Sequence, residues 1–138
     1  MEALRSAPEF VPELALVAER ERAVVGHVLF SRVLSGTVAD RALGLGPIAV
    51  QPTLQRQGIG GQLIRAGLEA AAALGFDAVV LIGHPAYYPR FGFVPGSRFG
   101  LRTTYDVPDD VWMARPLRPG GLENLAGEVR YSPAFDGV

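Results

Sequence analysis

The chain has 138 residues, and its 13 basic and 14 acidic side chains give a formal net charge of -1. This length predicts one domain with a real core, and the near-neutral charge argues against nucleic acid or a membrane surface as a partner. There is no cysteine, which excludes a disulfide framework and a cysteine nucleophile. No apolar run is long enough for a bilayer span and the N-terminus lacks a signal-peptide pattern, so we expect a cytoplasmic protein.

The first part of the chain predicts an antiparallel hairpin and a third strand. Residues 1–7 fit a short helix that Pro8 closes. Two apolar, β-branched runs at residues 14–19 and 24–34 are joined by a charged turn, which predicts the hairpin. A further apolar run at residues 42–50 predicts the third strand.

The middle of the chain predicts a βαβ unit. Apolar residues recur at spacings of 3 to 4 from residue 60 to residue 74, as in an amphipathic helix, and Gly75 is placed to end it. The apolar run at residues 78–82 predicts a fourth strand, parallel to the third and next to it.

Weaker patterns follow the βαβ unit. They indicate a short helix at residues 85–90, a strand at 111–114 and a weak strand at 128–131. The predicted fold is α/β with a mixed sheet, in a single domain over residues 1–138. Its core spans about residues 14–117, and residues 118–138 form a Gly- and Pro-rich tail.

The corner between the third strand and the helix carries the strongest functional signal. The first N–H groups of a helix have no intrahelical partner, and the helix dipole places partial positive charge there. Glycines let an anion approach the backbone closely, and an arginine adds a fork of donors that suits phosphate. The corner has both, in the run Gln55, Arg56, Gln57, Gly58, Ile59, Gly60 and Gly61.

Two better-known phosphate motifs do not fit this corner. A P-loop ends in Lys followed by Ser or Thr, whereas this chain has no Lys and Gln62 follows Gly61. Gly44, Gly46 and Ala49 match the spacing of a dinucleotide fingerprint. They lie before and within the strand rather than between strand and helix, so we treat the match as accidental.

Two motifs resemble the GNAT N-acetyltransferase superfamily. Residues 55–60 match its Gln/Arg-x-x-Gly-x-Gly/Ala corner, and residues 87–93 resemble its aromatic-Tyr-x-x-x-Gly-Phe segment, at the family's separation. Residues 84–99 and 107–110 are also similar to a small bacterial subgroup of predicted N-acetyltransferases. The resemblance covers about residues 14–117 and implies a GNAT-like fold, with antiparallel N-terminal strands before a βαβ unit that binds acetyl-coenzyme A.

The resemblance implies how the coenzyme binds. In the family, the strand before the corner pairs with pantetheine through its backbone, here Ile48, Ala49 and Val50. The corner amides hold the pyrophosphate, and the thioester lies where the two strands flanking the helix splay apart. The implied reaction transfers an acetyl group from acetyl-coenzyme A to a primary amine of a small molecule or peptide. The resemblance leaves the acceptor open.

The resemblance also implies a catalytic acid. Tyr88 matches the family tyrosine that protonates the departing coenzyme thiolate, and a phenol with a pKa of about 10 is a suitable donor. Its alternative role is to pack beneath the coenzyme. We expect Tyr87 and Phe91 to be packing residues.

The base is less well defined. Many family members carry a Glu near the position where this chain has Leu45, Gly46 and Pro47. His84 follows the fourth strand beside the cleft and is a candidate to relay a proton through water, with a structural role as the alternative. No His and carboxylate residues show metal-ligand spacing, so we predict no metal.

The chain departs from the family at its N-terminus. Members usually have a strand and one or two helices before the hairpin, whereas here only residues 1–12 precede it. Residues 14–18 then form a sheet edge and part of one sheet face is bare, from which we expect a homodimer. The two copies of such a dimer could also exchange a segment. The missing elements and the missing Glu also leave an alternative function, a catalytically silent coenzyme A-binding sensor or scaffold. A structural or nucleic-acid-binding module has little support.

Overall fold

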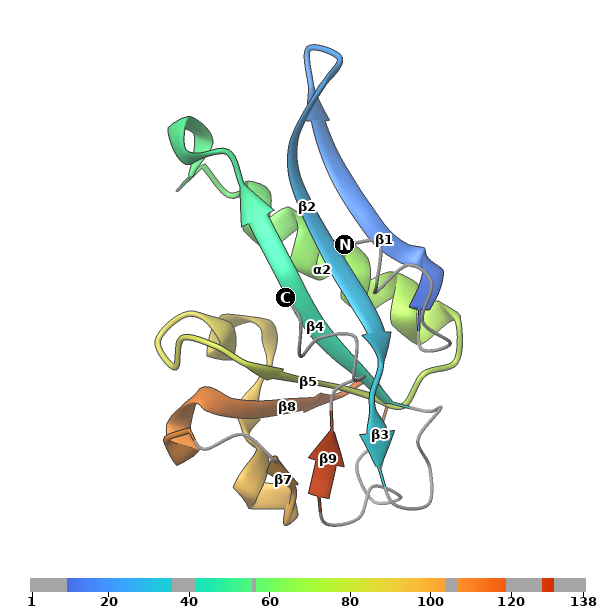
Figure 1. Ribbon diagram of the computed structural model, residues 1–138, viewed down its shortest axis with the longest axis vertical. Coiled ribbons are helices and arrows are strands. Elements are labelled where there is room, and N and C mark those ends of the chain that lie inside the picture. The colour runs from blue at the N-terminus through green and yellow to red at the C-terminus, as the bar shows by residue number, and fades with distance from the viewer. Residues whose placement is uncertain (1–9, 36–41, 56, 104–106, 119–127, 131–138) are drawn as a thin grey trace.

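The computed structural model describes residues 10–35, 42–55, 57–103, 107–118 and 128–130 (Figure 1). The predicted helix at residues 1–7 and the predicted phosphate ligand Arg56 lie outside these residues. The described strands are β1 (Phe10–Arg20), β2 (Ala23–Arg32), β3 (Leu34–Ser35), β4 (Ala42–Val50), β5 (Ala78–Ile82), β6 (Val94–Pro95), β7 (Arg102–Thr103), β8 (Trp112–Pro116) and β9 (Glu128–Arg130). The described helices are α2 (Ile59–Ala73) and the short 3-10 helices η2 (Pro52–Leu54), η3 (Tyr88–Phe91), η4 (Gly96–Phe99) and η5 (Asp109–Val111).

The described strands form two sheets, and the larger one carries the site. Its strand order is β1-β2-β4-β5-β8-β6, with β1 at one edge (Figure 1). The strands pair antiparallel except for β4 and β5, which are parallel. This confirms the predicted hairpin and the predicted parallel pair on either side of the crossover helix. The smaller sheet has the order β3-β9-β7.

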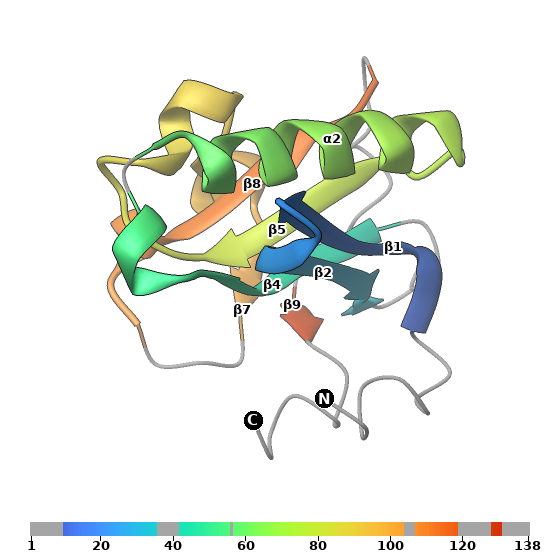
Figure 2. The same ribbon diagram turned by 90° about the horizontal axis from the view of Figure 1, so that it is seen from above.

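Helix α2 lies across one face of the larger sheet (Figure 2). Its apolar stripe packs on sheet residues in one buried cluster, to which Leu63, Ile64 and Leu68 belong. Leu74 caps the helix and Gly75, at φ 89°, ends it, as the sequence indicated. The elements on either side of the site are therefore held by a continuous core.

One glycine inside α2 has a packing reason. A Cβ added at Gly67 would lie 2.1 Å from Cε1 of Phe30, whose ring is fully buried. Glycine costs about 1 kcal/mol relative to alanine inside a helix, but here it lets the ring of a β2 residue reach the helix backbone. The close contact fixes α2 against β2.

The opposite face of the larger sheet has its own apolar cluster. It contains Ala78 and Val80 of β5 together with Trp112 of β8 and Leu101. Alternate residues of β5 belong to the cluster beneath α2, so β5 is buried on both faces, as is usual for a strand inside a parallel pair. Trp112 Nε1 donates a hydrogen bond of 3.2 Å to the Leu101 carbonyl, which satisfies its buried N–H.

The C-terminal half differs from the sequence prediction in detail. The predicted helix at residues 85–90 is a turn followed by η3, because Pro89 suits the start of a short helix and Gly92, at φ 90°, ends it. The strand predicted at residues 111–114 is β8, shifted toward the C-terminus. The predicted weak strand of the tail is confirmed as β9. Within the described residues, no helix has the length and apolar character needed to cross a membrane.

Candidate functional site

Strands β4 and β5 separate after a short paired stretch. Only Ala42, Leu43 and Gly44 of β4 pair with β5. Further along, β4 stays paired with β2 and β5 with β8, so each strand turns an open backbone edge toward the other (Figure 1). An open edge carries unpaired N–H and C=O groups that an extended ligand can use.

An irregularity in β4 lies directly after its last pair with β5. Leu45 and Ile48 pair with residues of β2 that are two positions apart, so Gly46 and Pro47 together face the single residue Leu29. This two-against-one pairing is a β-bulge, which bends the strand that carries it. Gly46 has φ 145°, a backbone conformation that other residues rarely adopt. The bulge thus coincides with the point where the strands part.

The corner after β4 presents backbone donors at the start of α2. Gly58, at φ 85°, is the N-cap, and its carbonyl accepts the first helical hydrogen bond from Gln62 N at 3.0 Å. The N–H groups of Ile59, Gly60 and Gly61 precede that bond. No described side chain caps them and the first turn has no acidic residue. These donors and the helix dipole make this end of α2 suitable for an anion.

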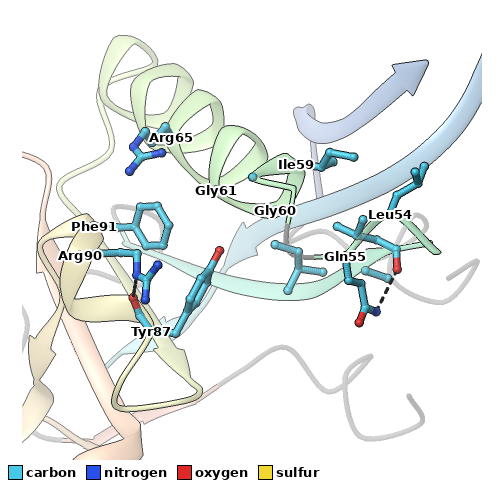
Figure 3. Close-up of a pocket in the computed structure, with 13 residues that line it drawn as sticks. Leu54, Gln55, Ile59, Gly60, Gly61, Arg65, Tyr87, Arg90 and Phe91 are labelled. Carbon is cyan, nitrogen blue, oxygen red and sulfur yellow. Dashed lines mark hydrogen bonds between the residues drawn. The ribbon is translucent and has the colours of Figure 1, made fainter. Parts of the chain in front are cut away.

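A cavity of about 650 Å³ joins the open edge of β4 to the start of α2 (Figure 3). Tyr87 reaches into it from the loop before η3, with its hydroxyl toward α2 (Figure 3). The lining comes from β4, the corner, the first two turns of α2 and the η3 region: Ile48, Ala49, Val50, Leu54, Gln55, Gly58, Ile59, Gly60, Gly61, Arg65, Tyr87, Arg90 and Phe91.

The structure brings together eight of the ten residues predicted to bind the coenzyme, namely Ile48, Ala49, Val50, Gln55, Gly58, Ile59, Gly60 and Gly61. Gln57 is not in the lining; its side-chain oxygen accepts a 3.0 Å hydrogen bond from Arg20 Nη1 of the hairpin. Arg56 lies outside the described residues. The Gln55 side-chain amide donates to the Val50 carbonyl at 3.2 Å, which ties the corner to the end of β4.

The glycines of the corner leave space that the protein does not fill. A Cβ added at Gly60 would meet only ordinary contacts, 3.6 Å from the Tyr87 hydroxyl and 3.8 Å from Val50 Cγ2. At Gly58 an added Cβ would find nothing within 4 Å. Since no packing requires a glycine at position 60, the free space beside its amide fits a ligand atom such as a phosphate oxygen.

Two arginines in the lining were not predicted. Arg65 lies one helical turn after Gly61, and its Cζ is 4.9 Å from the centre of the Phe91 ring. Arg90 has its Cζ 4.7 Å from the centre of the Tyr87 ring, and its Nε donates to the Tyr87 carbonyl at 2.9 Å. The spacing of four residues between Gly61 and Arg65 was the available signal, because it puts both on one helix face.

The aromatic residues of this loop do more than the sequence indicated. Tyr87 and Phe91 were expected only to pack, and their ring centres are indeed 5.3 Å apart. They also line the cavity and lie beneath the two arginines. They therefore form a wall of the site as well as part of the core.

Tyr88 lies behind this wall and is half-buried. Its ring centre is 5.1 Å from that of Tyr87 and 6.0 Å from that of Phe93, and it is not part of the lining of the cavity. Its ring also packs on Gly83, where an added Cβ would lie 2.4 Å from Tyr88 Cε2. Burial, and then the neighbouring Tyr87, raises the pKa of the Tyr88 phenol above its usual value of 10.0. The phenol is therefore neutral at physiological pH.

His84 follows β5 and is exposed. Its backbone carbonyl accepts hydrogen bonds from the amides of Tyr87 at 3.1 Å and Tyr88 at 3.4 Å, so its main chain shapes the turn that presents both tyrosines. It does not line the cavity. The described part of the chain also holds no group of three or more His, Cys, Asp or Glu residues arranged to bind a metal.

Known proteins are similar to this chain in sequence. The Acetyltransferase (GNAT) domain family matches residues 12–95. The uncharacterized N-acetyltransferase YjhQ of Escherichia coli K12 is 38% identical over 126 residues, which cover 86% of this chain and 68% of YjhQ. The uncharacterized N-acetyltransferase YhbS of the same organism is 33% identical over 124 residues, 89% of this chain and 74% of YhbS.

Solved structures agree with the sequence matches. The structure of YhbS from Escherichia coli in complex with CoA superimposes with a TM-score of 0.90 at 31% identity and covers 98% of this chain and 74% of that one. A GNAT family acetyltransferase from Brucella melitensis in complex with acetyl-CoA has a TM-score of 0.77 at 37% identity, and the match covers 98% of this chain and 75% of that one. The fold, the family match and these relatives together show that the chain belongs to the GNAT family of acetyltransferases.

Proposed function

We propose that this protein is an N-acetyltransferase that moves an acetyl group from acetyl-coenzyme A to a primary amine. The observation that carries the proposal is the cavity that joins the open edge of β4 to the uncapped start of α2. An extended chain of amides followed by a pyrophosphate has the matching shape and chemistry. The YhbS complex with CoA and the Brucella melitensis complex with acetyl-CoA support this choice of ligand.

In this proposal, two parts of the site bind two parts of the coenzyme. The amides of pantetheine pair with the backbone of Ile48, Ala49 and Val50, as an added strand would. The pyrophosphate accepts hydrogen bonds from the N–H groups at the start of α2, including that of Gly60. The acetyl thioester then lies between the diverging ends of β4 and β5.

The chemical step needs an attacking amine and a proton for the leaving group. The neutral amine nitrogen attacks the thioester carbonyl carbon, a C–N bond forms, and the C–S bond breaks to release the coenzyme thiolate. We propose that the Tyr88 hydroxyl protonates this thiolate. Two observations support the role: the ring of Tyr88 packs on Gly83, the residue after β5, and its raised pKa keeps the proton available.

The amine must also lose a proton before or during attack. Leu45, Gly46 and Pro47 offer no carboxylate at the bulge of β4. We propose that water receives the proton and that His84, exposed beside the turn that carries Tyr88, relays it. Replacing His84 with Gln tests this, because loss of the relay lowers kcat at neutral pH and leaves the affinity for acetyl-coenzyme A unchanged. Unchanged kcat leaves His84 with its structural role alone.

Acetyl-coenzyme A turnover with a panel of amines tests the function directly. Free-thiol release measures the rate, and mass spectrometry of the amine identifies the acetylated product. We expect amine-dependent thiol release above the rate without amine. Tight binding without turnover on any amine would instead favour the alternative, a coenzyme A-binding sensor. The absence of a carboxylate at the bulge of β4 supports that alternative. Absence of binding would contradict both functions.

We also propose that the protein forms a homodimer through β1. Among the described strands, β1 pairs only with β2 and forms an edge of the larger sheet. Val17 and Val24 of the hairpin are 55% and 52% exposed, which adds apolar surface at this edge. Sedimentation at micromolar concentration is expected to give a dimer, and a stable monomer would contradict the proposal.

A further inference from the structure

We propose that Arg65 and Arg90 form a second anion subsite, which binds the 3′-phosphate of coenzyme A and makes the protein discriminate against 3′-dephospho-coenzyme A. This inference rests on the proposed function, because it assigns the coenzyme's adenosine end to a definite place. It concerns a groove that lies beyond the pyrophosphate corner and that the pantetheine and pyrophosphate do not use.

The groove is a smaller cavity of about 360 Å³ between α2 and η3, bordered by β8. It shares Arg65, Arg90 and Phe91 with the larger cavity, so the two cavities adjoin at these three residues. A ligand bound at the start of α2 therefore lies next to the groove. Its other lining residues are Leu68, Glu69, Gly92 and Arg115.

The lining of the groove is strongly basic. Arg65, Arg90 and Arg115 contribute three positive charges and Glu69 one negative charge, which leaves a formal charge of +2. Within the described part of the chain, neither Arg65 nor Arg90 forms a salt bridge. A phosphomonoester carries close to two negative charges at neutral pH, so it matches the groove in both sign and size of charge.

Both guanidinium groups are held in place and keep free donors. Arg65 lies over the ring of Phe91 and Arg90 over the ring of Tyr87, contacts that restrict each side chain without using its N–H groups. Arg90 uses only Nε, which donates to the Tyr87 carbonyl. Arg115 is different, because its Nε and Nη1 already donate to the carbonyls of Phe91 and Pro116. Arg115 thus fixes the η3 loop, while Arg65 and Arg90 are free to bind an anion.

The position of Arg65 favours a phosphate on the same ribose as the pyrophosphate. Arg65 follows Gly61 by four residues, which is about 6 Å along the helix axis. The 3′-phosphate and the 5′-pyrophosphate of coenzyme A are attached to one ribose ring and are therefore a few bonds apart. A pyrophosphate at the start of α2 leaves the 3′-phosphate about one helical turn away, where Arg65 and Arg90 face the groove.

Isothermal titration with coenzyme A and with 3′-dephospho-coenzyme A tests the inference. The wild type is expected to bind coenzyme A at least about tenfold more tightly than 3′-dephospho-coenzyme A, which is the effect of one or two hydrogen bonds to a charged group. Arg65→Gln should bring this ratio close to one by weakening coenzyme A alone. Arg90→Gln should change the ratio in the same direction. Arg98→Gln is the matched control, because Arg98 is an exposed arginine of η4 outside both cavities, and it should keep the wild-type ratio.

Each outcome decides the inference. Equal binding of both ligands to the wild type would overturn it while leaving coenzyme binding intact. An Arg65→Gln variant that weakens both ligands equally would also overturn it, because Arg65 would then serve the pyrophosphate. If neither ligand binds, the proposed function fails as well. Circular dichroism on each variant shows whether it is folded, and Arg65 is exposed, so its replacement should leave the fold intact.

Discussion

Replacing Gly60 with alanine separates binding from folding at the proposed pyrophosphate site. The added Cβ would lie 3.6 Å from the Tyr87 hydroxyl and 3.8 Å from Val50 Cγ2, so the protein accommodates it without a clash. Gly60 is the second residue of α2. Alanine is favoured over glycine in a helix by up to about 1 kcal/mol. We therefore expect the free energy of unfolding of the apo protein to stay the same or to rise.

The same methyl group would occupy the space in which a phosphate oxygen approaches the Gly60 amide. A displaced phosphate loses at least one hydrogen bond to a charged group, worth about 1.5 to 3 kcal/mol. The dissociation constant for acetyl-coenzyme A should then rise about tenfold to a hundredfold. Stability and affinity thus change in opposite directions, which a general loss of structure would not produce.

Urea unfolding and isothermal titration measure the two quantities. Gln62→Ala is the matched control, because Gln62 is exposed on the same turn of α2 and does not line the cavity. It should raise helix stability by a few tenths of a kcal/mol and leave the affinity unchanged. Wild-type affinity in Gly60→Ala would refute the assignment of the pyrophosphate to this corner.

Three further substitutions test the catalytic acid and the packing of α2. Tyr88→Phe should lower kcat about a hundredfold or more with little change in acetyl-coenzyme A affinity, and unchanged turnover of this variant in initial-rate assays would remove Tyr88 as the acid. Wild-type kcat, measured by the same assays across pH, should show no alkaline loss below pH 10, because burial and then Tyr87 raise the pKa of Tyr88. Gly83→Ala should lower kcat in the same way, because its Cβ would displace the Tyr88 ring, and a wild-type rate would contradict that packing. Gly67→Ala should lower the free energy of unfolding, measured by urea denaturation, by about 1 to 3 kcal/mol, because overpacking against Phe30 outweighs the gain in helix propensity. A stabilised variant would show that the Phe30 ring can move away.

The sequence predicts the elements that local patterns define. The hairpin, β4, α2 and β5 all have a clear apolar periodicity, and Gly75 marks the helix end in both sequence and structure. The binding corner is also predictable, because strand, corner and helix are contiguous in the chain. A site built from one continuous segment needs no knowledge of tertiary packing.

The other wall of the site depends on packing that the sequence does not show. Tyr87 and Phe91 come from the η3 loop, more than 25 residues after Gly60, and line the cavity only because the loop folds back over α2. Arg65 and Arg90 come from α2 and η3 and line the same cavities, so no local motif contains both. The bulge of β4 follows from its pairing with β2 and explains where the strands part.

An amide chemical-shift titration tests the central claim most directly, and a chain of 14.7 kDa is well suited to it. Adding acetyl-coenzyme A to the ¹⁵N-labelled protein should shift the amides of Gly58, Gly60 and Gly61 and those of Ala49 and Val50 most strongly. The amides of the smaller sheet, formed by β3, β9 and β7, should change little. Large shifts confined to the smaller sheet, or none at millimolar coenzyme, would contradict binding at the corner between β4 and α2.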